Sequence, residues 1–216
     1  MKLDHDKFIN LCKSQSSATV SDLEVPEAPG VPVISKANTI AAFRGWTPFV
    51  GLQIEYSLIE RTVERELIPV AKDLGLTVSA WSPLAGGVLT GKYASGNARD
   101  ARYSSEMMQQ WIPDKDRTAR VLDALQSVSK QTGRNKAQIA LAWLRYRPVP
   151  VIPIIGARKI GQLQDNIASL EVSLTPEQVA LLDEASKIDL GFPHELYTHE
   201  MVRTFVYGGL RDRIIA

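Results

Sequence analysis

Hydrophobic and polar positions along the chain follow two alternating patterns, one typical of strands and one typical of helices. Three short apolar runs have strand character: FVGLQI at residues 49–54, TVSAW at 77–81 and VPVIPII at 149–155. Apolar residues recur at helical spacing around residues 37–43, 63–74, 121–128, 136–146 and 163–170. Strands that alternate with helices predict a parallel sheet with crossover helices, and strands this apolar predict cover on both faces.

Several residues mark where the helices should begin and end. Pro69 lies inside the second helical pattern and predicts a kink or a delayed start, and Gly75 predicts a left-handed helix end. Gly133 separates two later helices. The run Thr175-Pro176-Glu177-Gln178 predicts a capping box that opens a helix reaching about residue 187. Roughly the last 30 residues show no clear period.

The first 34 residues differ from the rest in composition. Ser and Thr are frequent over residues 13–22, and three prolines and a glycine crowd residues 24–32. Proline fixes φ and removes a backbone donor, so this stretch is expected to be loop-like. We therefore divide the chain into an irregular segment over residues 1–34 and an α/β part over residues 35–216. A glycine-containing loop is expected at residues 82–92 and an irregular segment at 93–115.

Composition narrows the classes of function. The 25 Lys and Arg against 24 Asp and Glu give a net charge of +1, which argues against nucleic-acid binding because that normally needs a basic face. The one cysteine, Cys12, excludes an internal disulfide and favours a reducing, cytoplasmic compartment. Three scattered histidines offer no metal-ligand spacing. No apolar run is long enough for a membrane span, and the N-terminus does not resemble a secretory signal.

The segment Gly86-Gly87-Val88-Leu89-Thr90-Gly91-Lys92 follows a predicted strand and matches the spacing of a phosphate-binding P-loop. The next residue is Tyr93, where that motif needs Ser or Thr for Mg²⁺, so a nucleoside triphosphatase is disfavoured. Two interpretations remain open. Small residues with one lysine can approach a pyrophosphate closely, or the segment is a glycine-rich surface loop.

A second candidate group follows the third strand. Gly156 ends that strand and Arg158 precedes a helix, where unpaired N–H groups and a guanidinium favour a phosphate. Gln162, Asp165 and Asn166 share one face of the predicted helix and can hydrogen-bond a nucleobase edge. The alternative is an ordinary solvated helix face.

Two side chains within the strands also have alternative roles. Gln53 is a lone amide in an apolar run, so it either bonds to neighbouring backbone or points into a barrel mouth toward a ligand amide. Trp81 ends its strand and either packs in the core or offers a flat face to a planar ring. The sequence lacks G-x-G-x-x-G and G-x-S-x-G, so it shows neither a Rossmann fingerprint nor a hydrolase nucleophile.

Long, ordered stretches of the chain resemble the aldo/keto reductase family, closest to the branch that contains bacterial reductases and the potassium-channel β subunits. The matching stretches are GWTPFVGLQIEYSLIERTVERELIP (45–69), LGLTVSAWSPLAGGVLTGKY (74–93), PIIGARKIGQLQDN (153–166) and the helix SLTPEQVALLDEAS. The resemblance covers residues 35–216 and implies a (β/α)₈ TIM barrel that binds NADP(H) without a Rossmann domain. The strands at 49–54, 77–81 and 150–155 then correspond to strands six, seven and eight of a partial barrel.

The resemblance also implies a role for each candidate residue. On the nicotinamide side, Gln53 is expected to bond the carboxamide and Trp81 to stack on the ring. The pyrophosphate is expected to be held by one loop and its cation: Ser82, Pro83, Leu84, Ala85, Gly86 and Lys92. The adenosine 2′-phosphate is expected at Gly156 and Arg158, and the adenine beside Gln162, Asp165 and Asn166.

One part of the family pattern is missing from the sequence. The family's catalytic tetrad of Asp, Tyr, Lys and His belongs to the N-terminal half of the barrel, and none of its sequence contexts occurs here. We therefore expect the cofactor-binding part of an NADP(H)-dependent oxidoreductase that passes hydride between nicotinamide and a small carbonyl or alcohol, inactive as this chain alone. The alternatives are a non-catalytic NADP(H)-binding or partner module, for example one that completes a barrel with a second chain, and an inactive fragment.

Overall fold

The computed structural model describes residues 30–92 and 114–208, together with residues 210 and 213. The chain forms two compact units, Met1–Ser186 and Lys187–Ala216. The segment before residue 30 and most of the predicted irregular segment, residues 93–113, lie outside the described residues. The division of the chain at residue 34 therefore stays a prediction.

The first unit contains a three-stranded parallel sheet in the order β1-β2-β3, as the alternation of strands and helices predicts. Its strands are β1 (Gly51–Glu55), β2 (Thr77–Trp81) and β3 (Val151–Pro153). Gln53 pairs with Ser79, and Ser79 pairs with Ile152, so these three residues share one face of the sheet. The outer strands β1 and β3 are shorter than predicted. Each forms backbone hydrogen bonds only over the residues that lie beside β2.

The two faces of the sheet differ, which corrects the expectation that both are covered. Leu52, Ile54, Val78 and Ala80 point to one face and are buried. The opposite face remains open: Gln53 is exposed, Trp81 is 42% exposed and Ile152 is 60% exposed. The strands alternate between apolar and polar or exposed positions, as a sheet with one packed face does.

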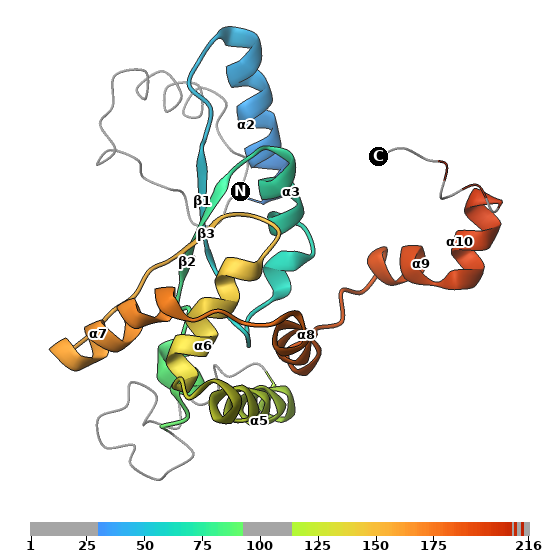
Figure 1. Ribbon diagram of the computed structural model, residues 1–216. Coiled ribbons are helices and arrows are strands. Elements are labelled where there is room, and N and C mark those ends of the chain that lie inside the picture. The colour runs from blue at the N-terminus through green and yellow to red at the C-terminus, as the bar shows by residue number, and fades with distance from the viewer. Residues whose placement is uncertain (1–29, 93–113, 209, 211–212, 214–216) are drawn as a thin grey trace. The chain divides into compact units, whose positions relative to one another are not determined.

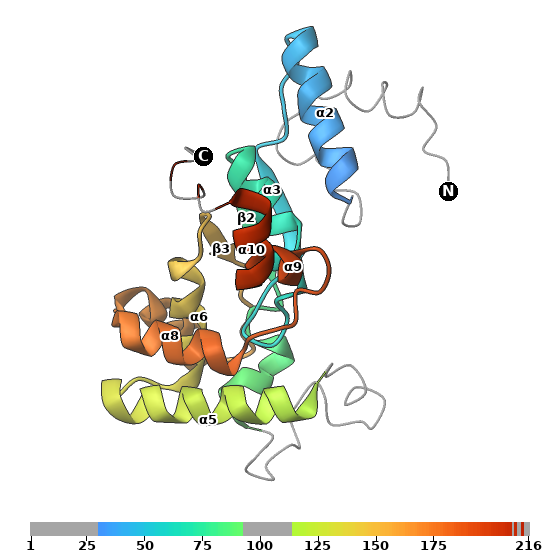
Figure 2. The same cartoon turned by 90° about the vertical axis from the view of Figure 1, so that its right-hand side faces the viewer.

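Helices cover the buried face of the sheet, and their apolar side chains join it in one core. The helical elements that contribute side chains to this core include α2 (Val31–Arg44), the 3₁₀ turn η3 (Thr62–Glu64), α3 (Leu67–Asp73), α5 (Lys115–Thr132), α6 (Lys136–Trp143), η6 (Leu144–Tyr146) and α8 (Pro176–Ala185). Figure 1 shows α3 and α6 on the same side of the strands. Figure 2 shows α5 running beneath α6 and α8. Full burial of side chains such as Leu58, Leu125 and Leu144 contributes roughly 1.5–3 kcal/mol each.

The predicted helix boundaries are confirmed where capping residues define them. Gly75 and Gly133 adopt φ of 64° and 68°, the left-handed conformation that ends a helix. The Thr175 side chain accepts from the Gln178 N–H, and the Gln178 side chain accepts from the Thr175 N–H. Pro69 lies in the first turn of α3, where its missing N–H costs nothing. The delayed start that it predicts is therefore seen.

Other boundaries differ from those predicted. Helix α2 (Val31–Arg44) begins within the stretch expected to be loop, because Pro32 in a first helical turn favours a helix start. The expected loop at residues 82–92 contains a 3₁₀ segment, η4 (Ala85–Thr90). Helix α7 (Ile160–Ile167) continues as η7 (Ala168–Glu171).

The second unit is helical, although its sequence shows no clear period. Its helices are α9 (His194–Thr198) and α10 (Glu200–Tyr207). They span five and eight residues, too few turns for a repeat to stand out. None of the helices in the described part of the chain is both long and apolar enough to cross a membrane.

Candidate cofactor site

The candidate site begins at the C-terminal ends of the parallel strands, where ligands bind in such folds. Gln53 in β1 and Trp81 in β2 lie on the same open face, two residues apart in register. The Tyr56 N–H donates to the Trp81 carbonyl and holds the two strand ends together. Both side chains are accessible to solvent. Gln53 is therefore not a buried amide bonded to neighbouring backbone, and Trp81 does not pack in the core. An amide and an indole face are therefore presented side by side.

The segment that follows Trp81 has an unusual backbone. Ser82 and Ala85 adopt φ of 49° and 48°, although side chains disfavour that region. Gly86 and Gly87 continue the left-handed run at 62° and 96°. Strained backbone of this kind persists where the surrounding structure enforces it, and it is common at ligand sites. Within this run the Ala85 N–H donates to the Ser82 carbonyl and the Gly87 N–H donates to the Leu84 carbonyl, so the left-handed residues form tight turns.

The rest of this segment places the Lys92 ammonium over Gly87. The Lys92 side chain lies against Gly87, with Nζ 2.6 Å from where a Cβ of that residue would stand. The Thr90 hydroxyl donates to the Gly87 carbonyl and accepts from the Lys92 N–H, which fixes the turn. Pro83 and Ala85 are buried, and Ser82, Leu84 and Gly86 are half-buried. The predicted pyrophosphate residues thus form one continuous structure rather than a set of separate side chains.

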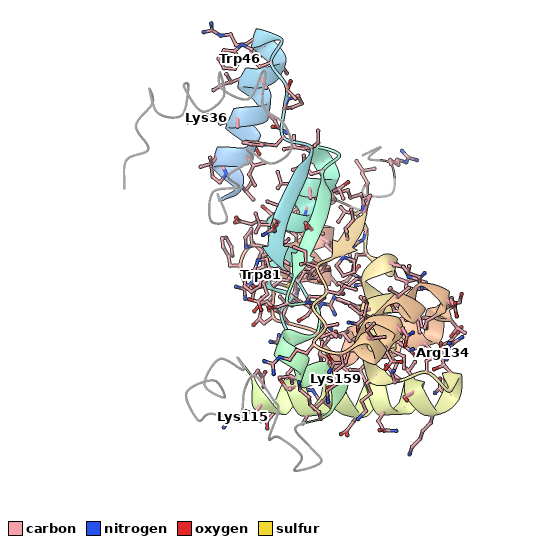
Figure 3. The ribbon with its side chains drawn as sticks, turned by 90° about the vertical axis from the view of Figure 1, so that its left-hand side faces the viewer. Lys36, Trp46, Trp81, Lys115, Arg134 and Lys159 are labelled. Carbon is pink, nitrogen blue, oxygen red and sulfur yellow. The ribbon has the colours of Figure 1, made fainter. Side chains whose placement is uncertain are left out.

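The loop after β3 carries the second candidate group. The Ile154 N–H donates to the Ala80 carbonyl, so the loop leaves the sheet beside the end of β2. Arg158 is exposed, and a Cβ on Gly156 would meet nothing within 4 Å. Figure 3 shows Lys159, the neighbour of Arg158, beyond the same end of the strands at which Trp81 lies. The open space and the positive charge fit a phosphate group.

The three polar residues of α7 do not share one exposed face. Gln162 and Asp165 are exposed, whereas Asn166 is buried with 7% of its surface accessible. Gln162 Oε1 accepts from the Arg158 N–H at 2.9 Å and from the Lys159 N–H at 3.3 Å. Gln162 therefore caps its own helix and shapes the loop that carries Arg158. Asp165 is the one residue of the three whose side chain is exposed and outside this capping interaction.

A polar network that the sequence analysis missed lies on the helix-covered side of the sheet. We call it the arginine–carboxylate network, formed by Arg61, Glu64, Arg147 and Asp183. Arg61 Nε and Nη2 each donate to a Glu64 oxygen at 2.8 Å. Arg147 donates to both Asp183 oxygens, at 2.9 and 3.2 Å, and Arg61 Nη1 lies 3.4 Å from Asp183 Oδ1. The only sequence signal was the i,i+3 spacing of Arg61 and Glu64, because Asp183 is more than a hundred positions away.

Two aromatic side chains complete this network. The Tyr56 hydroxyl donates to Glu64 Oε1 at 2.7 Å, and Trp143 Nε1 donates to Asp183 Oδ1 at 2.9 Å. The Arg147 guanidinium stacks 4.0 Å from the centre of the Trp143 ring. Burial, and then the negative charge of Glu64, raise the pKa of Tyr56. Tyr56 is wholly inaccessible and holds its proton tightly, which makes it unsuited to donate a proton to a substrate.

Glu55 is a further acidic group at the end of β1, paired in register with Trp81. Burial, and then the nearby Glu60, raise the pKa of Glu55 above its ordinary value. Glu55 is two residues after Gln53 in the same strand, so the sequence already indicates that the two side chains share one face. Across the described ranges, no three His, Cys, Asp or Glu side chains gather in a way that would hold a metal ion.

Comparison with known proteins identifies the family of the chain. The sequence profile of the Aldo/keto reductase family matches residues 30–187. An uncharacterized oxidoreductase of Bacillus subtilis is 41% identical over 151 residues, which are 69% of this chain and 44% of that protein. An NADP⁺ aryl-alcohol dehydrogenase of Phanerodontia chrysosporium is 31% identical over 169 residues, 76% of this chain and 44% of the relative.

A putative aryl-alcohol dehydrogenase of Saccharomyces cerevisiae is 32% identical over 168 residues, again 76% of this chain and 44% of the relative. The chain therefore spans about half the length of the curated relatives that it matches. The profile match covers most of the chain, and the parallel sheet with its helices is the architecture from which barrels of this family are built. The chain belongs to the aldo/keto reductase family.

Proposed function

We propose that this chain supplies the NADP(H)-binding part of an aldo/keto reductase barrel, with β1, β2 and β3 as its last three strands. The observation that carries the proposal is the gathering of Gln53, Trp81 and the left-handed glycine segment at one end of the sheet. When bound, the nicotinamide cofactor supplies or accepts a hydride for a carbonyl or alcohol substrate. The relatives named as oxidoreductases support that reaction class.

In this proposal each group of residues holds one part of the cofactor. Gln53 bonds the carboxamide and Trp81 covers one face of the nicotinamide, so the ring is oriented by an amide and an indole. The backbone of residues 82–86 and Lys92 hold the pyrophosphate. Arg158 binds the 2′-phosphate beside Gly156, with a guanidinium shaped for two hydrogen bonds to it. Asp165 takes the adenine side, while Gln162 and the buried Asn166 support the loop and helix.

The proposed reaction also needs a proton donor, which the described tyrosines of the first unit do not provide. Tyr56 is buried in the arginine–carboxylate network, and the Tyr146 hydroxyl accepts from the Leu174 N–H. We therefore propose that the proton-transferring groups belong to other parts of a complete barrel. Without them, cofactor binding and turnover separate, and this chain alone binds NADP(H) without reducing a carbonyl.

A second candidate function is a module that completes a barrel with another chain. The observation that favours it is apolar surface left open in the first unit: the sheet face at Ile152 and Ile154, and a stripe along α7 and η7. That stripe consists of Ile160, Leu163, Ile167 and Leu170, which are 42–75% exposed. Apolar side chains at helical spacing normally face another element. Carbonyl reduction that appears only when a second chain is added would support this function.

Cofactor choice tests the proposed site. Purified chain is titrated with NADPH and with NADH while tryptophan fluorescence is followed. Wild type should bind NADPH more tightly, and Arg158→Ala should lose about tenfold in NADPH affinity while its NADH affinity stays the same, since only NADPH carries the 2′-phosphate. The exposed Lys130→Ala on α5 is the charge-matched control. Equal NADPH affinity of Arg158→Ala and wild type would refute the assignment of Arg158 to the 2′-phosphate. Robust carbonyl-dependent oxidation of NADPH by the wild-type chain would refute the claim that it lacks a proton donor.

A further inference from the structure

A second lysine, Lys136, lies on the glycine segment, which consists of η4 (Ala85–Thr90) and its cap Gly91. Lys136 is more than forty residues from this segment in the sequence. Lys136 is the first residue of α6, and its side chain lies along the backbone of Gly91. Its Nζ stands 2.9 Å from the position that a Cβ of Gly91 would occupy, and its Cδ stands 3.2 Å from it. The absent side chain of Gly91 therefore makes the room that Lys136 uses.

The arrangement repeats the one that Lys92 makes with Gly87. Both glycines adopt positive φ, 96° at Gly87 and 77° at Gly91, and each has a lysine ammonium over its missing side chain. The two glycines belong to one short segment, η4 and its C-terminal cap. Two lysines from separate elements thus converge on the segment that directly follows residues 82–86, the backbone that we propose to hold the pyrophosphate.

The start of α6 is built in a way that fixes Lys136. The Asn135 side chain accepts from the Gln138 N–H at 2.9 Å, and Gln138 Oε1 accepts from the Asn135 N–H at 3.2 Å. This capping box defines the first turn of the helix, so the stem of Lys136 leaves from a defined point. Within the described part of the chain, no carboxylate forms an ion pair with Lys136. The N-terminus of α6 adds a partial positive charge in the same place.

We propose that Lys136 is a second phosphate ligand of the dinucleotide, acting beside Lys92 on the pyrophosphate. This inference rests on the proposed function. Two ammonium groups match the two negative charges of a pyrophosphate, and each is a compact point charge that tolerates several geometries. Because the pyrophosphate is common to both cofactors, Lys136 contributes to the affinity for NADPH and NADH alike. Arg158, in contrast, discriminates between them.

The test compares methionine variants, since methionine keeps a linear stem over the glycine and removes the charge. The affinities of Lys136→Met, Lys92→Met and Lys130→Met for NADPH and NADH are measured by fluorescence titration at low and high salt. We expect Lys136→Met to lose about tenfold in affinity for both cofactors, with an unchanged ratio between them and a weaker salt dependence. Inorganic pyrophosphate should also compete less well with NADPH for Lys136→Met than for wild type. Lys136→Arg should restore most of the affinity, and Lys130→Met should match wild type.

Three results would overturn the inference. If Lys136→Met binds like wild type while Lys92→Met is weakened, Lys136 is no phosphate ligand, and the proposed function still stands. If Lys136→Met loses affinity but keeps the wild-type salt dependence, or unfolds at a lower temperature, the residue supports the segment structurally. If wild-type chain binds neither cofactor, the inference fails together with the proposed function.

Discussion

The two sides of the sheet use polar side chains in opposite ways. On the helix-covered side, the arginine–carboxylate network turns its charges toward one another, and Trp143 within it is 0% exposed. At the strand ends of the open side, Gln53, Trp81 and Arg158 turn toward solvent. Charges that satisfy one another hold helices to the fold, whereas accessible groups beside strained backbone suit a ligand. We therefore expect substitutions on the helix-covered side to alter the free energy of unfolding, and substitutions at the strand ends of the open side to alter NADPH affinity.

The largest expected contrast is between two tryptophans. Trp143→Ala removes a buried ring and its hydrogen bond to Asp183, and should cost about 3–5 kcal/mol in the free energy of unfolding. Trp81→Ala should cost much less but weaken NADPH binding several-fold, because the indole face is lost. Urea unfolding and fluorescence titration measure the two effects. Should Trp143→Ala fail to fold, Trp143→Phe provides the milder variant. Equal destabilisation by Trp143→Ala and Trp81→Ala would contradict the different roles of the two sides of the sheet.

A smaller loss is expected at the centre of the arginine–carboxylate network. Asp183→Asn removes the charge between Arg61 and Arg147 and should cost about 2–3 kcal/mol, less than a fully buried pair because Asp183 is partly exposed. The exposed Asp123→Asn on α5 is the matched control and should be nearly neutral. Urea unfolding at neutral pH makes the measurement. A neutral Asp183→Asn would show that the network does not hold the fold.

Removing one hydroxyl gives a still smaller effect. Tyr56→Phe deletes the donor to Glu64 and should cost about 1.5–2 kcal/mol, the contribution of a hydrogen bond to a charged group. Tyr197→Phe, in the second unit, is exposed and should change nothing measurable. NADPH affinity should stay at the wild-type value in both variants. A loss of NADPH affinity in Tyr56→Phe would contradict the separation of the two sides.

The smallest effect concerns pH. The folded-state pKa of Glu55 lies above its ordinary value of 4.5, so the folded state holds this proton more tightly than the unfolded chain. The resulting stability is present below pH 4.5 and is lost as the pH rises through the folded pKa. Glu55→Gln should therefore raise stability near pH 7 by about a few tenths of a kcal/mol, since solvent screens a half-buried group, and leave it unchanged near pH 4. A variant that is less stable at pH 7 would contradict the cause given for the shift.

Local patterns predicted the strands and several helix ends of the first unit. The three strands follow from short apolar runs, and the helix ends at Gly75, Gly133 and Thr175 follow from conformations that those residues favour. The glycine-containing loop after Trp81 follows from Gly86, Gly87 and Gly91. Each of these features depends on a few neighbouring residues, which the sequence displays directly.

Features that depend on distant contacts were not predicted. The pairing of Arg61 with Asp183, the placement of Lys136 on Gly91 and the burial of Asn166 join residues through tertiary packing. The open face of the sheet was missed because an apolar run does not tell which of its faces another element covers. Gln53 was accordingly expected to be either satisfied or aimed at a ligand, and only the fold distinguishes an exposed amide from a buried one.

Amide hydrogen exchange with and without saturating NADPH shows which segments of the chain hold the cofactor. We expect slower exchange in residues 82–91 and 156–162 when NADPH is present, with no change in residues 68–73 of α3, which pack on the helix-covered side of the sheet. Unchanged exchange in both strand-end segments, or protection confined to the helix-covered side, would contradict this expectation.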